Sequence, residues 1–325
     1  MILDKIREGA IVTGGSGFIG SHMVDNLITS NIDNIVVIDN LSSGDYLNIS
    51  KYVDNGRIIF HKSDLSKSYI DEKLLNGVDT IFHFAAYPEV RFFDDPSKYF
   101  EDNVRSTFNL LEAIRKSSVK YLIFSSSSTI YGKPKIFPTP EQYGPLVPIS
   151  HYGSSKLACE ALISSFSHTY GFSSYVFRFA NVVGPRSKHG IIWDFIKKIK
   201  QDNKQLSILG DGTQSKSYIY IQDCIDAMLL SFKDLNDPVN ILNIGTEDAI
   251  DVISIADLVC SNMGIDNIEY NFIKSTLDGS GWIGDVKSMN LDISKVQKLG
   301  FNPRYSSKDA LSLAIKEILH SSKNI

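Results

Sequence analysis

The chain has 325 residues, 43% of them hydrophobic and 22% charged, which is enough apolar material for a packed core and excludes wholesale disorder. Its net charge of −4 gives no support for nucleic-acid binding, which depends on an excess of basic residues. No segment approaches the roughly 20 apolar residues of a membrane span, and the opening residues lack the apolar core of a signal peptide. The cysteines Cys159, Cys224 and Cys260 are isolated, which suits a reducing compartment and predicts neither a disulfide nor a metal site. We therefore expect a cytoplasmic protein.

The first half of the chain alternates short β-branched segments with helical patterns, which is typical of βαβ units and a parallel sheet. The segment Ile35–Ile38 is apolar on both faces, as expected of a strand between two helix layers. The predicted strands are Ala10–Thr13, Ile35–Ile38, Arg57–His61, Thr80–Phe84, Tyr121–Phe124 and Tyr175–Phe179. The predicted helices are Phe18–Ser30, Pro96–Ser117 and Ser154–Tyr170.

After Phe179 the alternation becomes less regular, and turn clusters separate shorter elements. We expect a helix near Asp223–Phe232, a strand at Val239–Ile244 and a final helix near Lys308–Leu319. Asp223 and Ser306 are candidate N-caps of the two helices. No internal repeat, low-complexity tract or flexible linker is present in the sequence.

Three glycines connect the first strand to the first helix with the spacing Gly-x-x-Gly-x-x-Gly: Gly14, Gly17 and Gly20. Such a turn can aim backbone N–H groups at a diphosphate. Asp39 ends the second strand about 20 residues further on, where a carboxylate can bind a ribose 2′-hydroxyl and repels a 2′-phosphate, so we expect NAD rather than NADP. Asp64 could lie near the adenine amino group or cap a helix, and His83 is expected to be a hydrogen-bonded core residue.

These features predict an α/β fold, a Rossmann-type doubly wound parallel sheet with a smaller C-terminal α/β substrate lobe. We expect residues 1–180 to form the NAD-binding domain and residues 181–325 to form the lobe. A later segment, about residues 223–250, is expected to pack back onto the first domain.

Tyr152 and Lys156 form a Tyr-x-x-x-Lys pair, which shares one face of a helix. The ammonium, helped by the positive nicotinamide ring, can lower the pKa of the phenol from about 10 toward neutrality. A serine-rich run, Ser125–Gly132, leaves a predicted core strand at the sheet edge where ligands bind in such folds.

Together these motifs resemble the extended short-chain dehydrogenase/reductase superfamily, specifically the NAD-dependent sugar-nucleotide epimerases and dehydratases. The likeness covers nearly the whole chain and points to UDP-glucose 4-epimerases of the archaeal type. Further segments that carry it are Arg178–Arg186, Ile208–Gly212, Asn243–Gly245 and Gly284–Val286.

The resemblance implies a role for each matched residue. Tyr152 would be the base and acid, Lys156 would bind the nicotinamide ribose and tune Tyr152, and Ser127 would bind the reacting sugar hydroxyl. The implied cofactor contacts are Gly14, Gly17, Phe18, Ile19, Gly20, Asp39, Asn40, Ser43, Gly44, Asp64, Leu65, Ala85, Ala86, Asn103, Ser125, Tyr152 and Lys156. The implied contacts with a nucleotide-sugar substrate are Ser127, Thr129, Tyr152, Asn181, Arg186, Lys216 and Asp285.

The resemblance also narrows the reaction. Dehydratases and decarboxylating relatives usually need a carboxylic acid just before Ile130-Tyr131, where this chain has Ser128 and Thr129. Epimerisation at C4 through a 4-keto sugar is therefore expected, with UDP-glucose and UDP-galactose as the implied pair. The helices Pro96–Ser117 and Ser154–Tyr170 would form the interface of a homodimer by the same resemblance.

Some positions depart from the family pattern. Tyr87-Pro88 stands where many bacterial epimerases have a Lys, and Lys216 and Trp282 replace arginines near the diphosphate. Arg91, Arg186 and His189 are candidates to compensate. The alternatives that stay open are a UDP-N-acetylhexosamine or UDP-hexuronate epimerase, a dehydrogenase that releases NADH, and a non-catalytic NAD-binding regulator.

Overall fold

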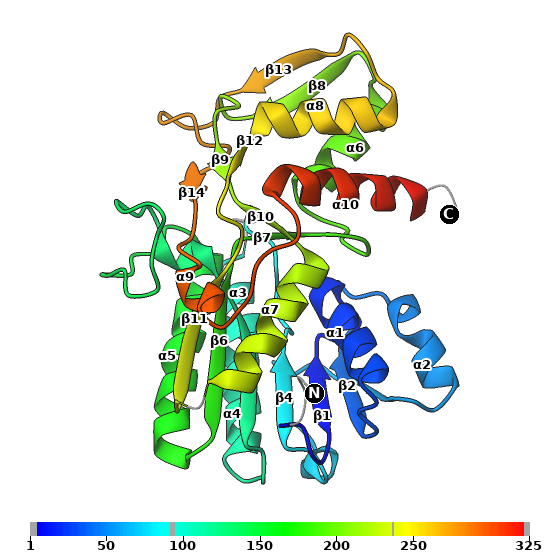
Figure 1. Ribbon diagram of the computed structural model, residues 1–325, viewed down its shortest axis with the longest axis vertical. Coiled ribbons are helices and arrows are strands. Elements are labelled where there is room, and N and C mark those ends of the chain that lie inside the picture. Colours follow the sequence, from blue (N-terminus) through cyan, green and yellow to red (C-terminus); the bar gives the residue numbers. More distant parts are fainter. Residues whose placement is uncertain (1–4, 92–94, 236, 322–325) are drawn as a thin grey trace.

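Seven parallel strands form the central sheet of the computed structural model, which describes residues 5–91, 95–235 and 237–321 (Figure 1). Across the sheet the strands run in the order β11-β6-β5-β4-β1-β2-β3, so the order reverses between β1 and β4. The Rossmann-type doubly wound sheet is confirmed, and its switch point is the place where such folds bind ligands. The strands are β1 (Ala10–Thr13), β2 (Ile35–Asp39), β3 (Ile59–Lys62), β4 (Thr80–His83), β5 (Tyr121–Ser127), β6 (Ser173–Phe179) and β11 (Val239–Ile244).

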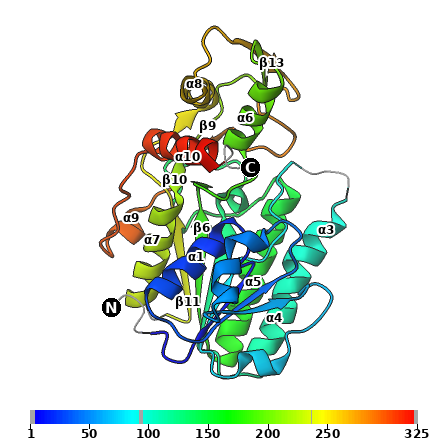
Figure 2. The ribbon, with the colours of Figure 1, turned by 90° about the vertical axis from the view of Figure 1, so that its right-hand side faces the viewer.

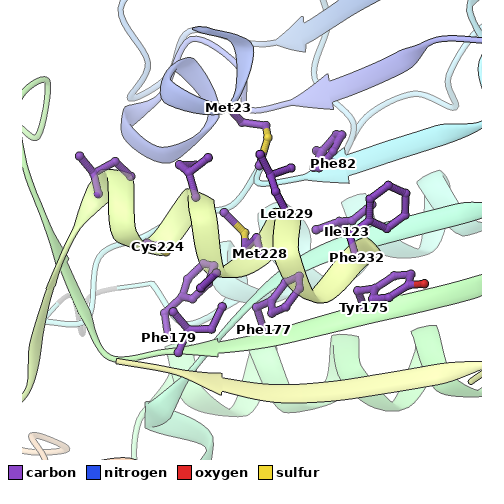
Figure 3. Packing of buried hydrophobic residues seen from close by; sticks show 14 of the residues in the cluster. Met23, Phe82, Ile123, Tyr175, Phe177, Phe179, Cys224, Met228, Leu229 and Phe232 are labelled. Atoms are coloured by element: carbon purple, nitrogen blue, oxygen red, sulfur yellow. The ribbon is translucent and has the colours of Figure 1, made fainter. Parts of the chain in front are cut away.

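Helices cover both faces of the sheet (Figure 2). On one face lie α1 (Phe18–Thr29) and α7 (Ile221–Asp234), and on the other lie α4 (Ser106–Ile114) and α5 (His151–Tyr170). Met228 and Phe232 of α7 pack with Phe177 and its neighbours on the sheet (Figure 3). All five residues of β2 are buried, as the sequence predicts for a strand between two helix layers.

A smaller lobe lies beyond the carboxyl ends of the strands (Figure 1). Ile196, Val259 and Leu311 belong to a hydrophobic core of its own. Its elements are β7 (Asn181–Val183), α6 (Ile191–Gln201), β8 (Gln205–Leu209), β9 (Ser215–Lys216), β10 (Tyr218–Tyr220), β12 (Ile250–Asp251), α8 (Val252–Met263), β13 (Glu269–Ile273), β14 (Ser288–Met289) and α10 (Ser307–Ser321). The short elements elsewhere are η1 (Tyr46–Asn48), α2 (Ser50–Asp54), η2 (Glu72–Leu75), α3 (Ser97–Tyr99), η3 (Phe100–Arg105), η4 (Ser128–Tyr131) and α9 (Ser294–Gln297).

Several predicted elements differ from the structure at their ends, and three of them lie near the carboxyl edge of the sheet. The helix predicted over Pro96–Ser117 is α3, a π-helical segment η3 and α4, and it ends at Ile114. Helix α5 begins at His151, not at Ser154, because the Ser150 hydroxyl accepts a hydrogen bond from the Gly153 N–H at 3.0 Å. Strand β5 continues to Ser127, so the first serines of the serine-rich run pair with β6 instead of forming a loop.

One of the two predicted helix caps is wrong. Asp223 lies inside the first turn of α7, and its carboxylate accepts hydrogen bonds from the backbone N–H and the guanidinium of Arg304 instead of capping the helix. The other cap is confirmed, because the Ser306 hydroxyl accepts a hydrogen bond from the Asp309 N–H at the start of α10.

Candidate active site

A cavity of about 680 Å³ lies between the carboxyl edge of the sheet and the smaller lobe. It brings together nearly all residues that the sequence predicts for the site. Those that line it are Gly14, Gly17, Phe18, Ile19, Gly20, Asp39, Asn40, Ser43, Gly44, Asp64, Leu65, Ala85, Ala86, Ser125, Ser127, Thr129, Tyr152, Lys156, Asn181, Arg186, Lys216 and Asp285. Asn103 is the predicted contact that does not line it.

The turn between β1 and α1 requires glycine at two positions. Gly14 has a φ of +68°, a left-handed conformation that side chains disfavour. A Cβ at Gly20 would lie 2.2 Å from the carbonyl oxygen of Gly14, so a side chain there would force the helix away from the turn. The N-cap residue Gly17 has no side chain to cap α1, which leaves the helix N-terminus directed at the cavity for an anion.

Asp39 connects the end of β2 to this turn. Its carboxylate accepts hydrogen bonds from the Ser16 N–H at 2.9 Å and the Leu41 N–H at 2.8 Å. Burial raises the pKa of Asp39, and the two backbone N–H groups act against that rise. The Ser16 hydroxyl is buried without a hydrogen-bond partner. A glycine cradle, an open helix N-terminus and a carboxylate at the end of the second strand fit a dinucleotide such as NAD.

The proposed catalytic side chains come from β5, η4 and α5. Lys156 is 2% exposed, and its ammonium donates a hydrogen bond to the Ser125 carbonyl at 2.7 Å. It lies 5.8 Å from the centre of the Tyr152 ring, one helical turn away. The Thr129 hydroxyl donates to the Ser127 hydroxyl at 3.0 Å. The cavity wall therefore presents a phenol, an ammonium and paired hydroxyls within one small region.

Burial of Tyr152 opposes the lowering of its pKa that the sequence argument expects from Lys156 and the nicotinamide ring together. Desolvation raises the pKa of the Tyr152 phenol, and the nearby Ser127 hydroxyl lowers it only in part. Burial also lowers the pKa of the Lys156 ammonium to about 8. The Lys156 ammonium gives a hydrogen bond to the Ser125 carbonyl in the same cavity wall.

Asn103 does not line the cavity but bonds to two segments that do. It is 1% exposed in the π-helical segment η3, and its amide donates to the Ser155 hydroxyl on α5 at 2.8 Å. Its side-chain oxygen Oδ1 accepts a hydrogen bond from the Tyr87 N–H at 2.7 Å, so the Asn103 side chain joins α5 to the loop after β4. Asn103 thus bonds to α5 and to the loop after β4, and its contact with the cofactor stays a prediction.

His83 is a hydrogen-bonded core residue, as predicted. It is fully buried at the end of β4, and its ring nitrogens contact the hydroxyls of Thr13 at 2.7 Å and Thr107 at 3.0 Å. Burial lowers the pKa of His83 to about 3, so the ring is neutral at pH 7. Asp64 uses one carboxylate oxygen to accept from the backbone N–H and hydroxyl of Ser66, which fixes it in a turn on the cavity wall.

The smaller lobe contributes charged and aromatic side chains to the opposite wall. Lys216 pairs with the buried Asp285 at 2.6 Å, and both Lys216 and Arg91 lie over the Trp282 ring, at 5.4 Å and 5.3 Å from its centre. The Asn181 amide donates to the Ser217 carbonyl at 3.1 Å. Lys216 and Trp282, the two residues that replace arginines of the family pattern, therefore lie in one cluster. Arg91, in the loop after β4, also belongs to this cluster.

Arg186, another predicted substrate contact, is held by the first helix. One guanidinium nitrogen pairs with Asp25 of α1 at 2.7 Å, and another is buried without a hydrogen-bond partner. Gln214, Trp193 and Asp194 also line the cavity, and sequence reasoning missed them because no spacing motif marks them.

No cluster of three or more His, Cys, Asp or Glu side chains that could hold a metal ion occurs among the described residues. No helix in the described ranges is long and apolar enough to cross a membrane.

The fold and the cavity define a dinucleotide-dependent enzyme of the short-chain dehydrogenase/reductase type. The model of the NAD dependent epimerase/dehydratase family matches residues 10–245, and the chain belongs to this family of sugar-nucleotide enzymes. A Methanocaldococcus jannaschii protein provisionally named UDP-glucose 4-epimerase is 33% identical, with 97% of this chain and 98% of that protein covered.

Solved structures agree with this assignment. A crystal structure of a UDP-galactose 4-epimerase has 38% identity and a TM-score of 0.84, covering 96% of this chain and 99% of that one. The UDP-glucuronic acid 4-epimerase of Bacillus cereus, in complex with UDP-glucuronic acid and NAD, has 29% identity and a TM-score of 0.86, with coverage of 96% and 99%. NAD is the cofactor of the family.

Proposed function

We propose that this protein is a UDP-hexose 4-epimerase that interconverts UDP-glucose and UDP-galactose. The observation that carries the proposal is the chemistry of η4. The site presents the hydroxyls of Ser127 and Thr129 beside Tyr152, and Ser128 and Thr129 occupy the positions where dehydration or decarboxylation would use a carboxylic acid. Hydroxyl groups can orient a sugar but cannot supply the acid that those reactions need.

In the proposed mechanism Tyr152 takes the proton of the sugar C4 hydroxyl and later returns it. Lys156 keeps a positive charge next to the phenol, and Ser127 holds the reacting hydroxyl. When bound, NAD supplies the acceptor and donor of the C4 hydride. Asn181, Lys216 and Arg186 would hold the diphosphate end of the substrate from the smaller lobe.

We further propose that the working form is a homodimer joined through α4 and α5. These helices lie side by side on one face of the sheet (Figure 2). That face exposes Phe100, Phe108 and Tyr170, and Phe108 packs edge-on against Phe166. Large exposed aromatic side chains on adjacent helices are typical of a surface that another protein covers.

The proposed reaction is tested by incubating the purified protein with UDP-galactose and no added cofactor, with products followed by chromatography and proton NMR. We expect UDP-glucose to appear with no net formation of NADH. Parallel incubations use UDP-N-acetylglucosamine and UDP-glucuronic acid. Conversion of UDP-N-acetylglucosamine or UDP-glucuronic acid without conversion of UDP-galactose would contradict the proposed substrate. In a separate incubation with added NAD, release of NADH would contradict epimerisation.

A further inference from the structure

A buried ion pair lies one helical turn beyond Lys156. Glu160 of α5 forms a two-point pair with the Arg178 guanidinium of β6, at 3.1 and 2.7 Å. The side chains of Arg178 and Glu160 are only 4% and 6% exposed. The same carboxylate accepts a hydrogen bond from the Ser126 hydroxyl of β5 at 2.5 Å. Glu160 therefore joins the catalytic helix to two central strands.

Ser126 stands between two residues of the proposed catalytic site. Its neighbour Ser125 accepts a hydrogen bond from the Lys156 ammonium at its carbonyl oxygen, and its other neighbour Ser127 ends β5, caps η4 and lines the cavity. Because alternate residues of a strand point to opposite faces, fixing the Ser126 side chain also fixes the orientation of both neighbours.

The remaining N–H groups of the Arg178 guanidinium have hydrogen-bond partners too. The Arg178 guanidinium also donates to the Tyr131 hydroxyl at 3.0 Å and to the Glu141 carbonyl at 2.9 Å. Tyr131 ends η4 and donates to the Asn243 side chain of β11 at 2.7 Å. The pair thus holds both ends of the segment from Ser126 to Tyr131.

Stability alone does not explain this arrangement. The desolvation cost of two buried charges can equal or exceed their attraction, and apolar replacements of similar volume are often neutral or stabilising. What the ion pair adds is a fixed geometry at the end of β5, where the reacting groups lie.

The charge of Glu160 also matters for Lys156. The titratable groups that face the ammonium are Tyr152, His83, Cys159 and Glu160, and Arg178 pairs with the last of them. Burial raises the pKa of the Cys159 thiol and lowers the pKa of the His83 ring, which keeps both neutral near pH 7. Among these described groups, Glu160 is the one carboxylate beside Lys156, four residues further along α5.

We propose that Glu160 is a positioning residue for the Tyr152–Lys156 pair, acting through Ser126 and Arg178 to fix the end of β5 and through its charge to keep Lys156 protonated. This inference rests on the proposed function, since the reaction defines what must be positioned. Glu160 does not contact the substrate or the cofactor in this scheme.

The first test removes one hydrogen bond and keeps the ion pair. Ser126→Ala should lower kcat of UDP-galactose epimerisation by about tenfold to a hundredfold with little change in KM, because misplaced groups slow the chemical step. Ser174→Ala is the matched control, since Ser174 is equally buried on β6 but bonds to the Pro238 carbonyl at the opposite end of the sheet. A rise in KM with unchanged kcat in Ser126→Ala would overturn the proposal. Equal effects of Ser126→Ala and Ser174→Ala on kcat would overturn it as well.

The second test uses Glu160→Gln and follows Lys156 directly. In protein labelled with ¹³C at the lysine ε-carbon, the Lys156 signal is assigned by its loss in Lys156→Met. Loss of the negative charge should move the Lys156 titration below its pKa of about 8, and the alkaline limb of the kcat profile should move to lower pH with it. A Lys156 titration equal to wild type contradicts the proposal.

The two tests separate this proposal from the proposed function. If the wild-type protein epimerises no nucleotide sugar, but the Lys156 titration moves to lower pH in Glu160→Gln, the proposed function alone is contradicted. An active wild type in which neither variant alters kcat or the Lys156 titration would contradict the positioning role alone. If Glu160→Gln does not fold, Ser126→Ala still decides the question.

Discussion

Tyr152 and Lys156 lie four residues apart on α5, but tertiary packing changes how they titrate. A pair of this kind on an exposed helix face would lower the pKa of the phenol through the neighbouring ammonium. Here desolvation raises the pKa of Tyr152, and the ammonium of Lys156 gives a hydrogen bond to the Ser125 carbonyl. We therefore expect the positive nicotinamide ring of bound NAD to act together with Lys156 in making Tyr152 a base near neutral pH.

Tyr152→Phe should keep the fold and the bound NAD and lower kcat by about 10²- to 10⁴-fold, since it removes the only proposed proton carrier. The measurement is UDP-galactose turnover together with NAD content and thermal unfolding. Tyr220→Phe is the control, because the Tyr220 hydroxyl bonds to Glu317 and does not line the cavity. A Tyr152→Phe variant as active as wild type would exclude the assigned mechanism.

At the scale of elements, the turn between β1 and α1 depends on the end of β2. Gly14 and Gly20 allow the close approach of turn and helix, and Asp39 accepts two backbone N–H groups that hold the turn and the following loop. The turn is therefore shaped by a strand that is next to it in the sheet and more than 20 residues away in the sequence.

Asp39→Ala should weaken NAD binding by about tenfold or more, because it removes a charged acceptor for the ribose and releases the Ser16 and Leu41 N–H groups. Isothermal titration of cofactor-stripped protein with NAD measures the change. Asp71→Ala is matched to it, since Asp71 also accepts the N–H two residues on but lies at the exposed η2. Equal NAD affinity in wild type and Asp39→Ala would mean that the carboxylate does not bind the ribose.

At the scale of the whole molecule, the cavity exists because the sheet reverses its order between β1 and β4 and the smaller lobe faces that edge. The two walls supply different chemistry. The sheet edge supplies the glycine turn, the phenol and the hydroxyls, and the lobe supplies Lys216, Asp285 and Trp282. Arg91 contacts Trp282 and therefore links the two walls.

The proposed homodimer gives a prediction at the same scale. Light scattering after size exclusion should give twice the 36.2 kDa mass of one chain. Phe108→Glu should produce monomers, because a charge would be buried at the interface without a partner. Phe272→Glu is the control, since Phe272 is also 38% exposed but lies on β13 of the smaller lobe. A wild-type protein with the mass of a single chain would contradict the proposed interface.

The amino-acid sequence by itself determined the strands of the large sheet, the glycine turn, Asp39 and the Tyr152–Lys156 pair. These features follow from short-range rules of burial periodicity, turn conformation and helical spacing, which act over a few residues. Tertiary structure alone decided the hydrogen bond of Asn103 to Ser155, the bond of Asp223 to Arg304, and the network of Glu160, Arg178 and Ser126. The physical reason is that each of these contacts joins segments far apart in sequence, whose approach depends on the packing of the entire sheet and its helices.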